Sequence, residues 1–410
     1  MSNKSDDIVI LGAARTPTGR FNGGLASMSV TELGAIAVEA AVSRSGIDPN
    51  TVYEVIMGQV VPAGTGQAAA RHAALNGGLP DTVGASAVNK ACGSSLKAVM
   101  LASNSIKAGE ADVFVAGGME SMSNAPYFLP KARQGLRYGH AELKDALLND
   151  GLWCAFEDWA MGNAADFIAR QFEVTREEMD EFALRSHKLA AEATANGRFQ
   201  EEIVPVEIKT RKGVVVVDKD EPIRAVFNNG DYELDTSIEQ LGKLRPAFEE
   251  DGQVTAGNAP GLNDGASAVV VTSRAEAERQ GLTPMAHIVG YCHAAVKPQW
   301  IFSAPAKAIP QLLEKVGWTM EDVDLFELNE AFAAQALANG VDMTRQGLNW
   351  DWDKVNVNGG AIALGHAIGS SGSRVLITLI YALRQRGLKR GVASLCLGGG
   401  EAVAMAIELE

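Results

Sequence analysis

The sequence predicts an α/β protein built from two similar halves, because one pattern of elements occurs twice along the chain. Each copy holds an apolar extended segment, a helix, a polar turn and a second apolar segment, at 8–10, 31–45, 46–52 and 55–58 in the first copy and at 288–289, 306–316, 317–323 and 325–328 in the second. The segment 112–120 of the first copy also matches 392–401 of the second. Strands that alternate with helices favour βαβ units and largely parallel sheets.

A stretch of different character, at about residues 123–250, separates the two copies. It contains an acidic helix at 175–196, and the start of this helix carries the capping sequence Thr175-Arg176-Glu177-Glu178. We therefore expect a first domain at 1–275, which includes this stretch as an inserted loop domain, and a second domain at 276–410. Long insertions of this kind commonly cover a binding site.

The composition excludes several classes of protein. With 410 residues, of which 47% are apolar and 21% are charged, the chain has the make-up of a soluble globular protein with two cores. The net charge of −14 leaves no global basic surface for nucleic acid, and no apolar run approaches the length that crosses a membrane. The polar first residues lack the pattern of a signal peptide, so we expect a cytoplasmic protein with reduced thiols.

The chain has four cysteines, and their spacing argues against a metal site. None belongs to a C-x-x-C pair, so neither a zinc nor an iron–sulfur site is predicted. We interpret Cys154 and Cys292 as ordinary small residues of the interior. Cys92 and Cys396 lie in glycine-rich turns and need a separate explanation.

Cys92 lies where a short strand is expected to turn into a helix. Residues 85–88 fit a buried strand, and apolar residues recur at helical spacing after Cys92 until Gly109. The free N–H groups and the dipole at a helix N-terminus favour a thiolate and can bind an oxyanion. Cys92 is therefore a candidate nucleophile, although a turn cysteine buried for packing explains the segment equally well.

His366 and Asn329 are the candidate partners of such a thiol. His366 stands between two glycine-rich segments, which suit close backbone contact with a ligand, and this setting favours a role as base over a structural role. Asn329 ends the apolar segment 325–328 and precedes an expected helix at 330–339. It could cap that helix, but beside a thiol and a base we prefer an asparagine that holds a water or a carbonyl group.

Cys396 ends an apolar strand and opens onto the glycines at 398–400. We interpret it as a second acid/base thiol, with the N–H groups of the glycines as an oxyanion site. A phosphate-binding loop does not fit, because no Lys-Ser or Lys-Thr follows the glycines. A dinucleotide-binding start does not fit either, because Gly12-Ala13-Ala14-Arg15-Thr16-Pro17 lacks the required glycine spacing.

Taken together, these segments resemble the thiolase family, and the resemblance runs almost from end to end. It is carried further by Gly117-Gly118-Met119-Glu120-Ser121-Met122-Ser123, Lys243-Leu244-Arg245-Pro246-Ala247-Phe248 and Thr255-Ala256-Gly257-Asn258-Ala259. The resemblance implies an α/β fold of two similar βαβαβαββ halves in a five-layer α-β-α-β-α arrangement. A loop domain is inserted in the first half of that fold.

The resemblance also implies a role for each candidate residue. Cys92 would carry the acyl group as a thioester, and His366 would act as its base and help to stabilise the oxyanion. Cys396 would remove the α-proton of the second acyl-CoA, or protonate the leaving carbanion in the cleavage direction. Asn329 would hold a water that completes one oxyanion hole, and the N–H groups of Cys92 and Gly398 would form the other.

For coenzyme A (CoA), the family pattern points to Met161, Arg224, Phe248, Ala259, Leu262, Ala331 and Phe332. Arg224 would contact a phosphate, although a solvated arginine is an equal alternative, and the phenylalanines could be core residues. Three positions depart from the usual short-chain pattern: Ala160 replaces a His, Pro260 replaces a Ser and Ala367 replaces a Pro. These departures bear on the acyl-chain preference.

The implied activity is the reversible condensation of two acetyl-CoA to acetoacetyl-CoA and CoA. The alternative within the family is a degradative 3-ketoacyl-CoA thiolase that cleaves fatty-acyl substrates or 3-oxoadipyl-CoA. A decarboxylating ketosynthase would use a second His in place of Cys396, and a silent acyl-CoA-binding relative would lack a catalytic residue. We expect no metal and no resident cofactor, since CoA thioesters are the substrates, and a homotetramer made of two dimers, with a dimer as the alternative.

Overall fold

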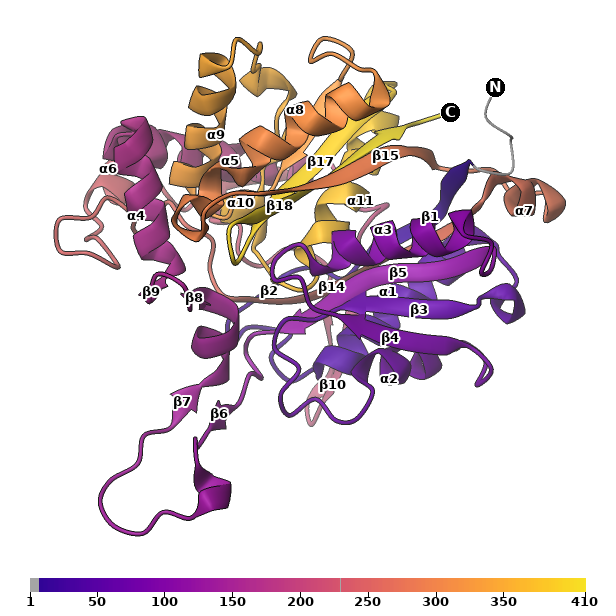
Figure 1. Ribbon diagram of the computed structural model, residues 1–410, viewed down its shortest axis with the longest axis horizontal. Helices are drawn as coiled ribbons and strands as arrows, with labels where there is room; N and C mark the ends of the chain where they lie inside the picture. Colours follow the sequence, from indigo (N-terminus) through magenta and orange to yellow (C-terminus); the bar gives the residue numbers. More distant parts are fainter. Residues whose placement is uncertain (1–6, 229) are drawn as a thin grey trace.

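The computed structural model describes residues 7–228 and 230–410, and its strands follow the same order in both halves (Figure 1). In the first half the order is β4-β3-β5-β14-β1, and in the second it is β16-β17-β18-β15; a short antiparallel pairing of β1 with β15 joins the sheets of the two halves edge to edge. In the second half, an isolated parallel β-bridge between Val355 and Phe326 of β16 takes the place that β4 has in the first half. The strands are β1 (Ile8–Arg15), β3 (Glu54–Gly58), β4 (Gly84–Val88), β5 (Val113–Ser121), β14 (Asn263–Ser273), β15 (Ala286–Ala295), β16 (Leu325–Leu328), β17 (Arg390–Leu397) and β18 (Glu401–Glu408).

The sheets are mixed, which corrects the expectation of largely parallel strands. β3 runs parallel to β4 and β5, and β16 runs parallel to β17, whereas β14, β1, β18 and β15 pair with their neighbours in antiparallel fashion. The reason is visible between β17 and β18, where residues 398–400 form a tight turn that can join only antiparallel strands. β4 is a partly exposed edge strand and not the buried strand expected at 85–88.

Helices complete a five-layer arrangement of the expected kind. α1 (Val30–Ser45) and α2 (Ala69–Asn76) cover one face of the first sheet, and α8 (Ala304–Val316) covers the far face of the second, with α9 (Ala333–Arg345) beside it. α3 (Ser94–Lys107) and α11 (Ser371–Arg386) lie between the two sheets (Figure 1). α9 starts three residues later than the helix expected at 330–339, because the chain bends at Ala331, whose N–H donates to the carbonyl of Asn329 at 3.1 Å, and Phe332 is extended.

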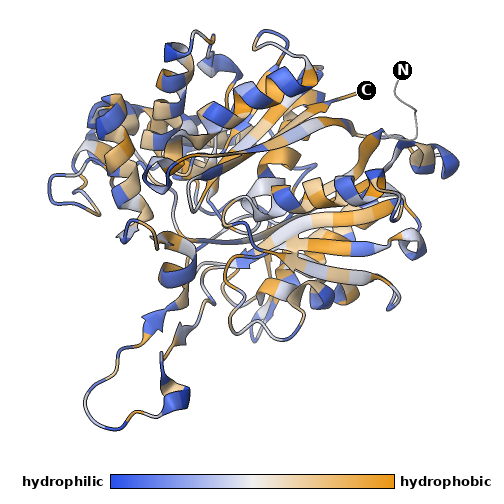
Figure 2. Cartoon of the chain, viewed as in Figure 1, coloured by the Kyte–Doolittle hydropathy of each residue, from blue (hydrophilic) through white to orange (hydrophobic). Residues whose placement is uncertain are grey.

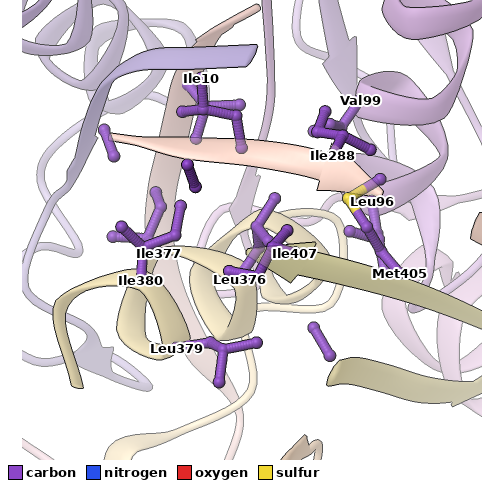
Figure 3. Packing of buried hydrophobic residues seen from close by; sticks show 14 of the residues in the cluster. Ile10, Leu96, Val99, Ile288, Leu376, Ile377, Leu379, Ile380, Met405 and Ile407 are labelled. Atoms are coloured by element: carbon purple, nitrogen blue, oxygen red, sulfur yellow. The ribbon is translucent and has the colours of Figure 1, made fainter. Parts of the chain in front are cut away.

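The middle layer is deeply buried. α11 is buried from Ser371 through Leu383, since both sheets and α3 surround it. Figure 3 shows Leu376 and Ile380 of α11 among Ile10, Ile288 and Ile407 from strands of both halves. Figure 2 shows the same distribution, with hydrophobic residues concentrated in the sheets and polar residues on the outer helices. Within the described residues, no helix has the length and apolar character needed to cross a bilayer.

The inserted segment lies between β5 and β14 and combines helices with four short two-stranded sheets. Its helices are α4 (Met161–Phe172), α5 (Arg176–Ala195) and α6 (Ile238–Gly242), and α5 starts with the predicted capping box of Thr175 and Glu178. A long arm around β6 (Tyr127–Phe128) and β7 (Lys144–Asp145) extends away from the body (Figure 1). The other small elements are β2 (Gly19–Arg20), β8 (Trp153–Cys154), β9 (Trp159–Ala160), β10 (Val206–Thr210), β11 (Gly213–Val217), β12 (Ala225–Asn228), β13 (Asp231–Leu234), α7 (Arg274–Arg279) and α10 (Ala361–Leu364).

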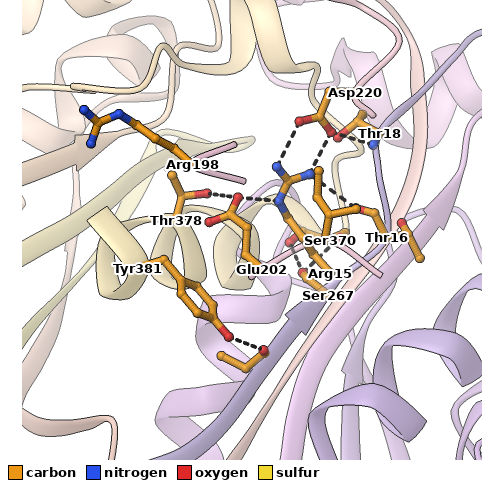
Figure 4. Close-up of polar contacts among 12 residues, drawn as sticks. Arg15, Thr16, Thr18, Arg198, Glu202, Asp220, Ser267, Ser370, Thr378 and Tyr381 are labelled. Carbon is orange, nitrogen blue, oxygen red and sulfur yellow. Dashed lines mark hydrogen bonds and ion pairs between the residues drawn. The ribbon is translucent and has the colours of Figure 1, made fainter. Parts of the chain in front are cut away.

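A buried ion-pair cluster fastens the inserted segment to the sheets (Figure 4). Arg15 of β1 is 1% exposed, and its guanidinium pairs with Glu202 and Asp220 of the inserted segment at 2.7 Å each. Burial lowers the pKa of Arg15, but the two carboxylates outweigh this effect and raise it above its usual value. Thr378 of α11 also donates to Glu202 at 3.1 Å, so the cluster joins three parts of the chain.

The first turns of α3 and α11 touch each other. The backbone N–H of Ser373 donates to Oγ of Ser95 at 2.8 Å. Gly372 faces the same contact, and a Cβ at this position would lie only 2.5 Å from the backbone nitrogen of Leu96. A glycine is therefore required here by the close approach of two helices, because any side chain would push them apart.

We predict that Gly372→Ala lowers the stability of the protein by about 2 kcal/mol, although alanine is the better helix former. The control is Gly242→Ala at the end of α6, where an added Cβ meets no atom within 4 Å. Thermal unfolding of both variants checks this prediction. A midpoint equal to that of the wild type in Gly372→Ala would show that the helices can separate without cost.

Candidate active site

One pocket contains Cys92 and Cys396, the two cysteines of the glycine-rich turns, together with His366. Cys92, His366, Cys396 and Gly398 all line it, although they come from three segments far apart in the sequence. Six of the seven predicted CoA residues line the same pocket: Met161, Phe248, Ala259, Leu262, Ala331 and Phe332. The pocket has a volume of about 860 Å³ including its open mouth, and its walls are mainly apolar. The two thiols therefore face the same cavity.

The turn before α3 holds Cys92 in place. Asn89 accepts the N–H of Ala91 at 3.0 Å, and Ser94 donates to the carbonyl of Ala91 at 2.6 Å while it accepts the N–H of Lys90 at 2.9 Å. These bonds stabilise Ala91 in the left-handed region at φ 44°, which is rare for a residue with a side chain. The expected position of Cys92 at a strand-to-helix turn is thus observed, between β4 and α3.

Two backbone N–H groups lie at the sulfur of Cys92, and they belong to Cys92 itself and to Gly398. Burial is the largest influence on this thiol and raises its pKa to about 11, while hydrogen bonds from these two N–H groups act in the opposite direction. A pair of N–H groups at a nucleophilic sulfur can also hold the oxyanion that forms after attack on a carbonyl carbon. The structure therefore brings together the two N–H groups that the family resemblance implied for one oxyanion hole.

Ser371 determines which ring nitrogen of His366 carries the proton. The Ser371 hydroxyl donates to the carbonyl of Ala367 at 2.9 Å, so its lone pairs remain to accept Nδ1–H of His366 at 2.6 Å. This arrangement leaves Nε2 without a proton, as a base requires. Burial, with a further effect from the charge of Arg374, lowers the pKa of His366 to about 3, so the imidazole is neutral at physiological pH.

Asn329 lies beside the free nitrogen of His366. Its Nδ2 is 3.5 Å from Nε2 of His366, and its Oδ1 faces Arg374 at 3.5 Å. Because Arg374 can only donate, it orients the amide with the NH₂ group toward His366. The side chain of Asn329 is 1% exposed, and its position allows it to donate to a group or a water beside the imidazole.

Cys396 lies near the end of β17 and is 1% exposed. Burial, followed by the negative charge that Cys92 would carry, raises its pKa well above that of an ordinary thiol. A thiol with a raised pKa is a strong base once it has lost its proton. All four cysteines of the chain are free, so no disulfide removes either of these thiols.

Sequence reasoning assigned no role to Glu120, which holds the loops around the site together. This buried carboxylate accepts the backbone N–H groups of Val60, Val61 and Gly369 at 2.9, 3.2 and 3.0 Å. Burial outweighs these bonds and raises its pKa to about 7. Its position at the end of a buried apolar strand is a signal that could have identified it.

The remaining predicted residue, Arg224, lies outside this pocket in an adjoining polar one. The departures Ala160 and Pro260 line the pocket that contains Cys92 and Cys396, whereas Ala367 lines a small cavity behind His366. Several apolar wall residues escaped the sequence reasoning because helical and loop segments contribute them singly: Met122, Leu148, Leu152, Ile301, Phe302 and Ile368. Within residues 7–228 and 230–410, no three His, Cys, Asp or Glu side chains are grouped so that they could hold a metal ion.

Comparison with known proteins agrees with this geometry. Residues 8–275 match the family description "Thiolase, N-terminal domain" and residues 282–409 match "Thiolase, C-terminal domain". The chain is 50% identical to an acetyl-CoA acetyltransferase of Cupriavidus necator, over 98% of this chain and 99% of that protein. It is 49% identical to an acetyl-CoA acetyltransferase of Rhizobium meliloti over 100% of both chains. The crystal structure of the Bacillus anthracis acetyl-CoA acetyltransferase superposes with a TM-score of 0.93 at 44% identity, covering 98% of this chain and 99% of that one. The protein described here belongs to the thiolase family.

The protonation states of Cys92 and His366 give a testable pH dependence. Since the pKa of Cys92 is raised to about 11, its thiolate fraction should grow about tenfold per pH unit up to about pH 10. Since the pKa of His366 is lowered to about 3, no step should appear near pH 6.5. The rate of iodoacetamide labelling of the Cys92 peptide, followed by mass spectrometry, measures this profile.

The control for this profile is an unstructured peptide with one cysteine, whose labelling should level off above its ordinary pKa of about 8.5. A plateau for Cys92 below pH 8 would contradict the prediction. It would indicate a thiolate–imidazolium pair in the resting protein.

Proposed function

We propose that this protein is an acetyl-CoA acetyltransferase, which condenses two acetyl-CoA to acetoacetyl-CoA and CoA and catalyses the reverse reaction. The observation that carries the proposal is the meeting of two thiols, one imidazole and two backbone N–H groups in one apolar pocket. Two relatives that are 50% and 49% identical to this chain over nearly their full length carry this name, so the degradative 3-ketoacyl-CoA alternative is not favoured. The chemistry requires no metal and no resident cofactor, because the thioesters themselves are the substrates.

The first half-reaction loads an acetyl group onto the enzyme. Nε2 of His366 takes the proton of Cys92, and the thiolate attacks the thioester carbonyl of acetyl-CoA. The N–H groups of Cys92 and Gly398 hold the negative oxygen of the tetrahedral intermediate. The carbon–sulfur bond to CoA then breaks, and CoA leaves as a thiol with the proton that His366 carried.

The second half-reaction forms the carbon–carbon bond. Cys396 gives its proton to Nε2 of His366 and, as a thiolate, removes an α-proton from a second acetyl-CoA. The protonated His366 and the amide of Asn329, through a bound water, then stabilise the enolate oxygen. The α-carbon attacks the acetyl group on Cys92, and the carbon–sulfur bond of that thioester breaks to release acetoacetyl-CoA. The sulfur of Cys92 leaves as a thiolate and takes the proton that His366 carries, while Cys396 keeps the α-proton, so all three groups return to their starting protonation states.

The walls of the pocket support this sequence of steps. Phe332 packs edge-to-face with Phe248 and Phe302, at ring-centroid distances of 6.4 and 5.4 Å. Such an apolar wall excludes water, which protects the acyl-enzyme from hydrolysis and strengthens the fixed N–H donors. The predicted CoA residues Met161, Ala259, Leu262 and Ala331 would contact the pantetheine arm along the same wall.

Single substitutions at the two thiols separate the half-reactions. Cys92→Ser and Cys396→Ala should each lower turnover by about a thousandfold, since each removes a nucleophile or an acid/base group. Only Cys396→Ala should still form an acetyl adduct at residue 92 after incubation with acetyl-CoA, as mass spectrometry of the intact protein will show. The control is Cys154→Ser, a buried cysteine outside the pocket.

Unchanged turnover in either of the two catalytic-site variants would contradict the assignment. The same assays compare acetoacetyl-CoA with 3-ketohexanoyl-CoA and 3-oxoadipyl-CoA in the wild type. A tenfold preference for one of the longer substrates would favour the degradative alternative.

We further propose that the protein is a cytoplasmic homotetramer. The arm supports this assembly, because it exposes large hydrophobic side chains away from the body: Tyr127, Leu136, Tyr138 and Leu143. The edge strand β4 offers unpaired backbone groups to a second subunit, so two dimers could be joined by their arms. A cytoplasmic location fits a mechanism that needs two reduced thiols.

We predict that replacing residues 131–143 of the arm with a short Gly-Ser linker converts the tetramer into a dimer. The remaining pairs of Tyr127 with Asp145 and of Phe128 with Lys144 keep the base of the arm closed. Light scattering during size-exclusion chromatography measures the mass of both forms. A wild type that already elutes as a dimer or monomer would overturn the proposed assembly.

A further inference from the structure

An ion pair joins the two turns that supply the N–H groups at the sulfur of Cys92. Lys90 lies shortly before Cys92 in one turn, and Glu401 directly follows the glycines of the other, which begin with Gly398. The ammonium group of Lys90 pairs with the carboxylate of Glu401 across 311 positions of the sequence. Both side chains are partly exposed and lie outside the wall of the pocket. Sequence reasoning assigned no role to either.

The backbone of each charged residue belongs to its turn. The N–H of Lys90 donates to Oγ of Ser94 at 2.9 Å, and the carbonyl of Lys90 accepts the N–H of Gly93 at 3.1 Å. Glu401 begins β18 and pairs directly with Leu397 across the three-glycine turn. An attraction between the two side chains therefore acts on the turns themselves.

The two turns also pack directly on each other. A Cβ added to Gly93 would lie 2.6 Å from Cδ2 of Leu397, and one added to Gly398 would lie 3.3 Å from Cβ of Ala91. Such packing limits how closely the turns approach, but it is non-directional and leaves them able to slide past each other. A charge-assisted hydrogen bond has a preferred geometry. Among residues 7–228 and 230–410, this is the one ion pair that joins the two turns.

We propose that the ion pair of Lys90 and Glu401 sets the spacing of the two N–H groups that hold the oxyanion, so both side chains are positioning residues for the acylation of Cys92. This inference rests on the proposed function, in which a thioester carbonyl is attacked at this sulfur. The donors of an oxyanion hole contribute most when they are fixed before the charge develops, so a small displacement of one turn against the other slows the reaction.

The test compares two reactions of the same thiol. Transfer of the acetyl group from acetyl-CoA to Cys92 passes through an oxyanion, whereas alkylation by iodoacetamide displaces iodide and forms none. We expect Glu401→Gln and Lys90→Met each to lower the acetylation rate about tenfold, less than the loss of a whole donor, and to leave the alkylation rate unchanged. Rapid quenching followed by mass spectrometry measures both adducts.

Two other patterns would overturn the proposal, as would an unchanged acetylation rate. A general loosening of the Cys92 turn would lower both rates together. A direct effect of the Lys90 charge on the thiolate would slow alkylation in Lys90→Met and speed it in Glu401→Gln, because the second change frees the cation.

The double variant tests whether the two side chains act as a pair. Lys90→Met combined with Glu401→Gln should lose no more acetylation rate than either single change, because each single change already breaks the pair. A loss of about a hundredfold, the product of the two single effects, would show independent roles and overturn the proposal.

The matched control is Glu408→Gln, which breaks the ion pair with Arg390 at the other end of β17 and β18 and should change neither rate. Both ion pairs are partly exposed and contribute little to stability, so these variants should fold.

A second acetyl donor distinguishes failure of this inference from failure of the proposed function. p-Nitrophenyl acetate acylates a thiol through an oxyanion and requires no recognition of CoA. If only this ester acetylates the wild type, the proposed reaction is rejected, and a lowered ratio of acetylation to alkylation in the variants supports the ion pair. An unchanged ratio in an enzyme that condenses acetyl-CoA rejects the ion pair alone. A wild type that neither donor acetylates rejects both.

Discussion

The site depends on the contact between the first turns of α3 and α11. Cys92 precedes one helix and His366 precedes the other, so the distance between thiol and imidazole is fixed by how closely these helices approach. Ser95 and Ser373 meet at this point, and a glycine at 372 allows the approach. Because both sheets enclose the two helices, the contact cannot relax without disturbing the apolar layer around it. The geometry of the site is thus a property of the middle layer, not of the loops that carry the reactive groups.

The repeated topology is used asymmetrically. β5 of the first half and β17 of the second half occupy the same place in the repeated strand order. The end of β5 carries a glycine pair and Glu120, whereas the end of β17 carries Cys396. Glu120 organises backbone N–H groups from three segments, and Cys396 faces the pocket. The corresponding strand ends of the two halves therefore carry different groups: the first holds a carboxylate that organises the framework, and the second holds a thiol that faces the pocket.

Much of the fold was predictable from the sequence, because it depends on local signals. The capping box at Thr175 and the apolar run of α11 each identify a helix without reference to the rest of the chain. Parallel sheets were wrongly expected, since the pairing of β17 with β18 follows from a short turn whose direction the hydrophobic pattern does not encode. The convergence of Cys92, His366 and Cys396 was expected from their glycine-rich surroundings and from resemblance to a family. Glu120 was not identified, because its role arises from contacts with segments far apart in the chain, and Ser371 was not identified, because its bond to His366 depends on the fold of the loop between them.

The ion pairs of Arg15 have a consequence for how the molecule holds together. The guanidinium belongs to the first strand and both of its carboxylates belong to the insertion, and all three groups are shielded from solvent. While Arg15 stays in place, the loss of either carboxylate would leave a buried cation without full compensation, at a cost of several kcal/mol. The two ion pairs therefore couple the inserted segment to the first strand. We expect the insertion and the sheets to unfold together in one cooperative transition.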